Sequence, residues 1–426
     1  MSVAAAAREG ALASGVAPAS PLERWHFVAA LSLIGMLPFL LGAQASGKLA
    51  ADAAELFADQ GDPSKQAVLA LVYASFGALL LWRVRLVRLT KLGAPLIALI
   101  LLCAASALWS DLPLVALRRS AALAGTVTIG LYAALRFDID ELLELLCRVV
   151  AIVLVASFVL AALEPSLGLD TEGRLRGVFA HKNSFGIFAA LGLLALSARA
   201  LRRPSRDSAV FCALCAVGCL TGLVLSDSAS PLPALVVGLA FMTWVHRSRA
   251  NAGWLMPSLV AAACAAAIAL PLFSDAFGVF ALVVGRDADF SHRDLVWRFA
   301  LELFSRNPWL GYGYEVFWNG PAGELFFRTA GFAVSHAHNG YLQLTLDTGI
   351  VGLMAFLCAL AMLMRRALPL LGAGYRPRVA WLVGFTAFYV VASAAESHAW
   401  KANDLLTVLF VYAAARTNVL SEDAHA

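Results

Sequence analysis

The fold of this chain is decided by two long apolar runs and the polar segment between them. The first run reads LLELLCRVVAIVLVASFVLAAL over residues 142–163, and the second reads SFGIFAALGLLALSARAL over residues 184–201. Each run has about 20 residues, the length that an α-helix needs to cross the hydrocarbon core of a bilayer. Neither run alternates apolar with polar residues as a barrel strand does. Both runs therefore predict membrane-spanning helices.

The composition of the whole chain agrees with this prediction. Hydrophobic residues make up 61% of the 426 residues and charged residues only 14%, whereas a soluble domain is typically about half apolar and about a quarter charged. We therefore expect an all-α polytopic membrane protein with the lipid bilayer as its surroundings. The net charge of +4 is too small to indicate a nucleic-acid partner, and we expect none.

Apolar runs separated by charged breaks predict about twelve spans. Nine are expected within residues 26–272 and three within residues 341–416, with short cytoplasmic tails at 1–25 and 417–426. We expect the first tail to be disordered. The predicted spans cover residues 26–43, 66–82, 93–109, 119–135, 142–163, 184–201, 208–225, 231–246, 253–272, 341–364, 379–395 and 404–415.

The basic residues indicate the orientation of these spans. Arginine and lysine crowd alternate short loops, for example Arg83 to Lys91 and Arg199 to Arg206. Because short cytoplasmic loops carry the excess of positive charge, both termini are predicted to be cytoplasmic. Residues 164–183 and the long loop 273–340 then lie on the periplasmic face of a bacterial inner membrane. They retain arginines on the side where the rule disfavours them, which suggests a function.

The long loop 273–340 has the composition of a folded segment, because it is rich in aromatic residues. Within it, residues 291–306 carry apolar residues at helical spacing and predict an amphipathic helix that ends before Pro308. We expect this helix to lie over the mouth of the bundle, parallel to the membrane.

The polar island at residues 173–183 reads Gly-Arg-Leu-Arg-Gly-Val-Phe-Ala-His-Lys-Asn. Its potential cations are Arg174, Arg176, His181 and Lys182. An arginine fork binds phosphate through two parallel hydrogen bonds and does not lose its charge. Together with Arg293 of the long loop, this island therefore suits a diphosphate at the membrane surface.

A second polar island, residues 335–341, contains His336, His338 and Asn339 at the head of an apolar run. An imidazole there has a pKa suited to a general base at neutral pH, although the same cluster could simply cap the following helix. The sequence does not decide which of the two histidines is the base. A zinc site is disfavoured, because no third ligand stands beside the His-x-His pair, and we expect neither metal nor cofactor.

Taken together, four segments resemble the O-antigen ligase/polymerase superfamily of bacterial membrane proteins, most of all its exopolysaccharide polymerase branch. They are residues 173–183, Ser-His-Arg-Asp-Leu-Val-Trp at 291–297, Asn-Pro-Trp-Leu-Gly-Tyr-Gly at 307–313, and His-Ala-His-Asn-Gly-Tyr-Leu at 336–342. Trp-Ser-Asp at 109–111 also fits. One departure is the turn at 226–230, where many relatives have an arginine and this chain has none.

The resemblance implies a fold like that of type-C glycosyltransferases, and an inverting, metal-independent transfer of glycan from an undecaprenyl-diphosphate carrier to an acceptor hydroxyl of a second glycan. It implies Arg174 and Arg293 as diphosphate ligands and His338 as the base. Arg176 and Lys182 are further candidates for the diphosphate, and His181, Asn183, His336 and Asn339 are supporting residues. A flippase or a chain-length regulator is the kind of protein partner that it suggests.

Three functions stay open from the sequence. The first is a polymerase that joins repeat units of an exopolysaccharide or O-antigen, and the second is a ligase that moves a finished glycan to lipid A core or to a protein. The third is a small-solute transporter, which is disfavoured because the chain has no internal repeat and almost no ionisable residue in the middle of its predicted spans.

Overall fold

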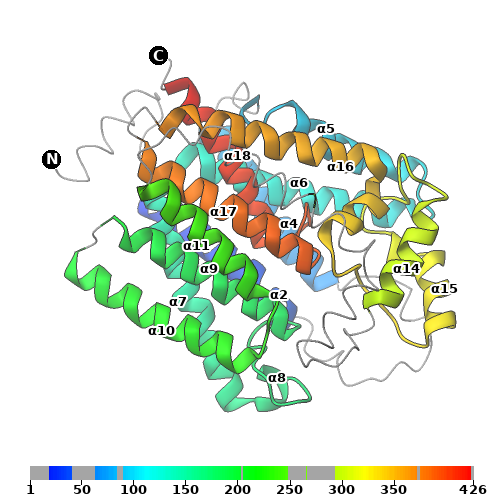
Figure 1. Ribbon diagram of the computed structural model, residues 1–426, viewed down its shortest axis with the longest axis horizontal. Helices are drawn as coiled ribbons and strands as arrows, with labels where there is room; N and C mark the ends of the chain where they lie inside the picture. Colours follow the sequence, from blue (N-terminus) through cyan, green and yellow to red (C-terminus); the bar gives the residue numbers. More distant parts are fainter. Residues whose placement is uncertain are drawn as a thin grey trace.

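The computed structural model of the protein describes residues 19–40, 63–83, 90–202, 205–247, 265, 293–371 and 375–423 (Figure 1). Over these residues the chain is built from helices. The extended pairing found there is one isolated antiparallel bridge, between Leu169 and Leu175. The predicted all-α polytopic class is confirmed.

Seven described helices are long and apolar enough to cross a membrane. They are α4 (Pro63–Arg83), α6 (Pro113–Arg136), α7 (Ile139–Leu163), α9 (Lys182–Ala200), α10 (Arg206–Ser226), α16 (Gly340–Ala367) with its extension η6 (Pro369–Leu371), and α17 (Arg376–Ala395).

Four more helices coincide with the other predicted spans: α2 (Pro21–Leu40), α5 (Ala94–Ala105) followed by η3 (Ser106–Leu108), α11 (Pro231–Arg247) and α18 (Leu405–Asp423). The predicted span at 253–272 lies outside the described residues, apart from position 265.

One end of the bundle is held by ion pairs between helix termini. Arg136, the last residue of α6, donates to the Glu23 carboxylate of α2 at 3.0 Å, and Arg24 donates to Glu141 of α7 at 2.6 Å. Since successive helices run in opposite directions, the first residues of α9 and the last residues of α10 and α17 lie at the other end. Which end faces the cytoplasm stays a prediction from the basic loops.

Glycines bring α11 and α17 close together. A Cβ added to Gly238 would lie 3.1 Å from the carbonyl oxygen of Gly384, and one added to Gly384 would lie 2.6 Å from the Cβ of Met242. Small residues allow helices to approach closely in lipid, where dispersion contacts replace the hydrophobic effect as the driving force. This packing fixes the position of α17 and therefore of the residues that follow its last turn.

Helix α16 is broken at Gly349, which has φ +68° and ψ −170°. The loop that follows α14 fills the break with its own backbone. The bonds run from the N–H of Ile350 to the carbonyl of Pro308 at 2.8 Å, from Tyr312 to Leu346 at 2.8 Å, and from Gly313 to Asp347 at 3.0 Å. Backbone groups freed inside a membrane helix need such partners. The break separates a head at residues 340–348 from the longer part of the helix.

The described part of the long loop forms a small folded unit at one end of the bundle (Figure 1). It contains α14 (Arg293–Phe304), η5 (Phe317–Asn319) and α15 (Pro321–Ala330). α14 confirms the helix expected at 291–306, with a start and an end two residues inside the predicted ones, and it buries Val296, Trp297, Ala300 and Leu303. Sequence analysis did not predict α15. An aromatic cluster around Phe299, Trp318 and Phe326 joins the two helices.

Replacing Gly349 with alanine tests whether the break is required. The added Cβ would lie 2.0 Å from the carbonyl oxygen of Trp309, and the residue would keep a positive φ. We expect unfolding in detergent to become easier by about 2 kcal/mol or more. Gly77→Ala in α4 is the control, because no atom lies within 4 Å of its added Cβ. Equal melting temperatures for the two variants would show that position 349 does not require glycine.

Candidate active site

The two predicted polar islands meet at one carboxylate, Glu396, which follows α17. Its Oε1 accepts hydrogen bonds from Asn183 Nδ2 at 2.7 Å and from Arg293 Nη2 at 2.9 Å, and its Oε2 lies 3.1 Å from His338 Nδ1. Arg293 also donates from Nη1 to the carbonyl of Ala395 at 2.9 Å. Glu396 therefore joins the start of α9, the start of α14, the approach to α16 and the end of α17.

Glu396 is 7% exposed, and its neighbours determine its charge. Burial alone would raise its pKa, but the hydrogen bond to His338 and the positive charge of Arg293 outweigh burial and hold the pKa well below the usual carboxyl range. Glu396 is therefore a carboxylate at neutral pH. Its partners are those that a buried charge needs.

The loop after Glu396 is itself fixed in place. Asp404 caps the start of α18, its Oδ1 accepting from the backbone N–H of Leu406 at 2.7 Å. Its other oxygen lies 2.7 Å from His398 Nδ1. Burial would raise the pKa of Asp404, yet the charge and hydrogen bond of His398 lower it overall. This short connection between α17 and α18 thus holds Glu396 from its C-terminal side.

His338 has a backbone conformation that few residues other than glycine adopt, with φ at +51°. Its neighbours hold it there. The Oδ1 of Asn339 caps α16 by accepting from the N–H groups of Tyr341 and Leu342, both at 3.0 Å. On the other side, the carbonyl of Ala337 accepts from Trp297 Nε1 of α14 at 2.8 Å. Such strain persists only where surrounding contacts enforce it, and it is typical of functional sites.

The ring of His338 has the arrangement of a general base. Nδ1 faces the Glu396 carboxylate, which favours the tautomer with its proton on Nδ1 and its lone pair on Nε2. Nε2 has no hydrogen-bond partner in the part of the chain that the structure describes, and the side chain is 31% exposed. The carboxylate would also stabilise the imidazolium that forms when Nε2 takes up a proton.

His336 lies directly beside His338, with ring centroids 4.1 Å apart. Burial, and next the charge of Lys401, lower the pKa of His336 well below its ordinary value. His336 is thus neutral at pH 7. Of the two histidines that the sequence left undecided, only His338 contacts Glu396 by a hydrogen bond between the described residues.

The start of α9 is packed against the turn after α10. Asn183, which donates to Glu396, accepts at its Oδ1 from Ser228 Oγ at 2.9 Å, and Lys182 Nζ donates to the carbonyl of Asp227 at 3.2 Å. The ring of His181 caps α9, its Nδ1 accepting from the Asn183 N–H at 3.1 Å. The turn that lacks the arginine of many relatives therefore supplies hydroxyl and carbonyl groups to the site instead.

Arg174 and Arg176 make their contacts within their own loop. Arg174 forms ion pairs with Asp170 at 2.8 Å and Glu172 at 2.5 Å. Arg176 donates to the carbonyls of Leu167 and Ser166 at 3.0 and 3.1 Å, next to α8 (Pro165–Gly168). No described contact joins either guanidinium to His338. Their predicted role in binding diphosphate stays a prediction.

His181 shows that this loop is nevertheless close to the Glu396 cluster. Burial lowers the pKa of His181, and the charges of both Glu396 and Asp170 act on it in the opposite direction. Since charge effects fall off with distance, His181 is close enough to Glu396 and to Asp170, the partner of Arg174, for both charges to act on it.

His336, His338 and Glu396 also form a group whose ligand atoms lie within 4.8 Å of one another. Sequence analysis disfavoured a metal because it found no third ligand, and the fold supplies one. However, one oxygen of Glu396 already binds Arg293 and Asn183. A divalent cation would face the guanidinium charge across the same carboxylate, which disfavours its binding.

Comparison with known proteins finds a family and a relative that this chain resembles. The family model described as O-Antigen ligase matches residues 214–357, which contain Arg293, His336, His338 and Asn339. The chain is also 27% identical over 263 residues to the exopolysaccharide production protein ExoQ of Rhizobium meliloti (strain 1021). The chain is therefore similar to the O-antigen ligase family over part of its length. The aligned region covers 58% of this chain and 58% of the ExoQ protein.

Glu396, the hub of the site, lies outside the segment that the O-antigen ligase family model matches. It was missed in the sequence because it is a single carboxylate at the end of a predicted span, where a headgroup contact is the usual explanation. The sequence did contain one feature that could have identified Glu396. Glu396 and His398 follow α17 in a chain that has almost no charge inside its predicted spans.

The lowered pKa of His336 predicts a pH dependence of stability. In the folded protein His336 stays neutral below pH 6.5, whereas in the unfolded chain it takes up a proton. Its contribution to stability is therefore present above pH 6.5 and is lost as pH falls. We expect His336→Gln to reduce the loss of stability between pH 7.5 and pH 5.5 by up to about 1 kcal/mol. Thermal unfolding of the parent protein and of His336→Gln in detergent, at pH 7.5 and at pH 5.5, measures this loss of stability.

His425→Gln is the matched control, because His425 belongs to the predicted C-terminal tail. That variant should keep the pH dependence of the parent protein. If His336→Gln kept it as well, His336 would not be a buried neutral imidazole.

Proposed function

We propose that the protein is a membrane glycosyltransferase that transfers glycan from an undecaprenyl-diphosphate carrier to an acceptor hydroxyl. The observation that carries this proposal is the contact of His338 with Glu396, on a carboxylate that Arg293 also binds. It unites an oriented proton acceptor with a fixed cation at one end of a helical bundle. Similarity to the O-antigen ligase family and to an exopolysaccharide production protein supports this chemistry.

In the proposed reaction, Nε2 of His338 takes the proton of the acceptor hydroxyl. The hydroxyl oxygen forms a bond to the anomeric carbon while the bond from that carbon to the diphosphate oxygen breaks. The electron pair leaves with the diphosphate, and the anomeric configuration inverts because attack comes from the face opposite the leaving group. Glu396 stabilises the imidazolium, as the carboxylate does in other base–carboxylate pairs.

The leaving diphosphate needs positive charge at its oxygens. Arg293 is held within reach of His338 by Glu396 and has a buried Nε with no partner among the described residues. We propose Arg174 as the second ligand, with a diphosphate oxygen exchanging for one of its two carboxylate partners. Arg176 and Lys182 would add charge at the edge of the same site. No step in this mechanism needs a metal ion.

Between the two reactions of this superfamily, we favour polymerisation of repeat units. The relative is named as an exopolysaccharide production protein, and the first polar island has the His-Lys-Asn form of the polymerase branch. A ligase that acts on lipid A core or a protein would use the same residues. We place the site on the periplasmic face of the inner membrane, with both termini in the cytoplasm.

Two substitutions test the assignment of residues. Replacing His338 or Arg174 with alanine should abolish long polymer, because a positioned base alone contributes about 10²–10⁴-fold to rate. Polymer length is measured in cells that carry each variant, with insertion checked in isolated membranes. Arg306→Ala is the control, since Arg306 is exposed and its ion pair with Glu302 of α14 is exposed as well.

Normal chain length in both variants would refute the assignment. The acceptor is identified in a strain without the protein. Free repeat units on the carrier would indicate a polymerase, whereas a completed but unattached polymer would indicate a ligase.

The proposed absence of a metal from the reaction gives a separate prediction. We expect transfer by the purified protein to be unchanged after treatment with EDTA, because base and cations are both supplied by side chains. Turnover of a lipid-diphosphate-linked repeat unit measures this. If EDTA stopped the reaction and a divalent cation restored it, His336, His338 and Glu396 would be reassigned as metal ligands.

A further inference from the structure

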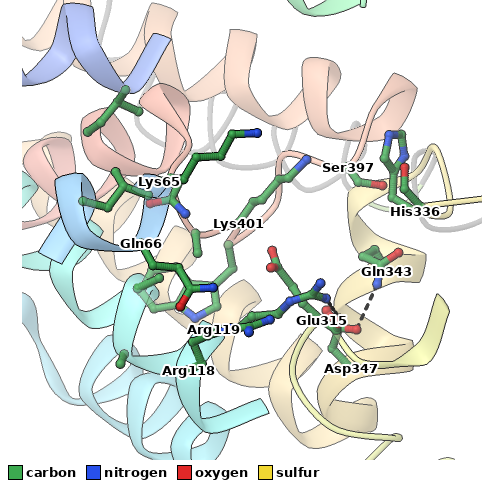
Figure 2. A pocket seen from close by; sticks show the side chains of 18 of the residues that line it. Lys65, Gln66, Arg118, Arg119, Glu315, His336, Gln343, Asp347, Ser397 and Lys401 are labelled. Atoms are coloured by element: carbon green, nitrogen blue, oxygen red, sulfur yellow. Dashed lines mark hydrogen bonds between the residues drawn. The ribbon is translucent and has the colours of Figure 1, made fainter. Parts of the chain in front are cut away.

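A cavity of about 710 Å³ adjoins the candidate active site and has no role in the mechanism above. It lies where the first turns of α4 and α6 meet the head of α16 and the connection between α17 and α18 (Figure 2). His336 is part of its wall, and the ring of His336 packs at a tilt against the ring of His338. The cavity therefore opens beside the proposed base.

Positive charge dominates the polar wall of this cavity. Four cationic side chains line it, and two carboxylates oppose them, which leaves an excess of two positive charges. The cations are Lys65, Arg118, Arg119 and Lys401, and the carboxylates are Glu315 and Asp347. Asp347 is buried and accepts a hydrogen bond from Gln343 at 2.9 Å. The remaining charge favours an anionic ligand.

Two of these cations, Lys65 and Lys401, differ from the others in their contacts with the described residues. Neither the Lys65 nor the Lys401 ammonium group has a hydrogen bond or an ion pair with any described residue. Figure 2 shows both lysines extended into the cavity, with their ammonium groups directed toward the side on which Ser397 and His336 lie. Ser397 is 5% exposed and lines the same cavity, and its Oγ has no partner among the described residues. A buried hydroxyl with no partner among the described residues can donate a hydrogen bond to a bound anion.

One part of the cavity wall is apolar and belongs to three helices of the bundle. Ile34 of α2, Leu69 and Ala70 of α4, and Ala121 and Ala122 of α6 form it. Of the seven candidate spans, α4 is the least covered by the protein, with 17% of its apolar window buried. A ligand with an anionic head and a hydrocarbon tail matches this combination of charge and apolar surface.

We infer that this cavity binds the phosphate headgroup of a second lipid-linked glycan, the acceptor, through Lys65, Lys401 and Ser397. The inference rests on the proposed function, in which a donor diphosphate is bound by Arg293 and Arg174. The two sets of cations share no residue. Arg293 binds the carboxylate that His338 also contacts, and Lys65 and Lys401 line the same cavity as His336. An acceptor glycan anchored by its lipid phosphate would thus reach the base from a site of its own.

The test uses the purified full-length protein in detergent and three probes: geranylgeranyl diphosphate, inorganic diphosphate and geranylgeraniol. We expect two molecules of the lipid diphosphate per protein. Lys65→Gln combined with Lys401→Gln should weaken binding at one site at least tenfold. Arg293→Ala should remove binding at the other site. Arg328→Gln, at an exposed ion pair of α15, is the control and should keep both.

The other two probes separate the possible sources of binding. Weaker binding of inorganic diphosphate, with the same loss in the double lysine variant, supports recognition of the phosphate with help from the lipid. Equal binding of the two diphosphates would overturn the lipid part of the inference. If geranylgeraniol binds equally well with and without the two lysines, the hydrocarbon tail contributes to binding. If geranylgeraniol does not bind, the tail does not contribute. One lipid diphosphate per protein, unaffected by the double lysine variant, would overturn the whole inference.

Kinetics distinguish failure of this inference from failure of the proposed function. The double lysine variant should raise the acceptor concentration at half-maximal rate at least tenfold and leave kcat within about threefold. A loss of kcat without a change in that concentration would contradict an acceptor site while leaving His338 as the base. Full activity of His338→Ala would instead contradict the proposed function itself.

Discussion

The structure depends on one buried negative charge, that of Glu396. A carboxylate at this depth is unfavourable unless it is paired and hydrogen-bonded, and three side chains from three separate segments meet this requirement. Removal of any partner would leave the charge less compensated. The same interactions that stabilise the charge therefore draw α9, α14, α16 and α17 to one point. Structural stability and orientation of the proposed base depend on the same atoms.

Around this carboxylate, helix ends and breaks determine how each side chain points. The break in α16 at Gly349 frees its head, and Asn339 caps that head just before it starts. Between cap and loop, His338 is held at positive φ with Nδ1 toward Glu396. The unused Nε2 is therefore the atom available to a substrate. Rigid placement of this kind lowers the reorganisation needed in the transition state.

Two groups of cations are proposed to bind the two substrates, and the groups differ in their partners. Arg174 and Arg293 are engaged by carboxylates, whereas Lys65 and Lys401 have no such partner among the described residues. Arginine suits a bidentate contact with a leaving diphosphate, and lysine acts as a point charge on a flexible stem. This difference fits a donor that must be positioned at its reacting bond and an acceptor that is anchored at a distance from it.

The sequence by itself predicted the helical membrane class, which the structure confirms, and eleven of its predicted spans coincide with described helices. It also singled out His338 and Arg293, whose role as site residues stays a prediction. Those features are local: the length of an apolar run, and a histidine beside a helix cap. Glu396, the confinement of Arg174 and Arg176 to their own loop, the break at Gly349 and the lysine-lined cavity were decided only by the tertiary structure. Each depends on which distant segments become neighbours, as when residue 396 meets residues 183, 293 and 338, and no local pattern carries that information.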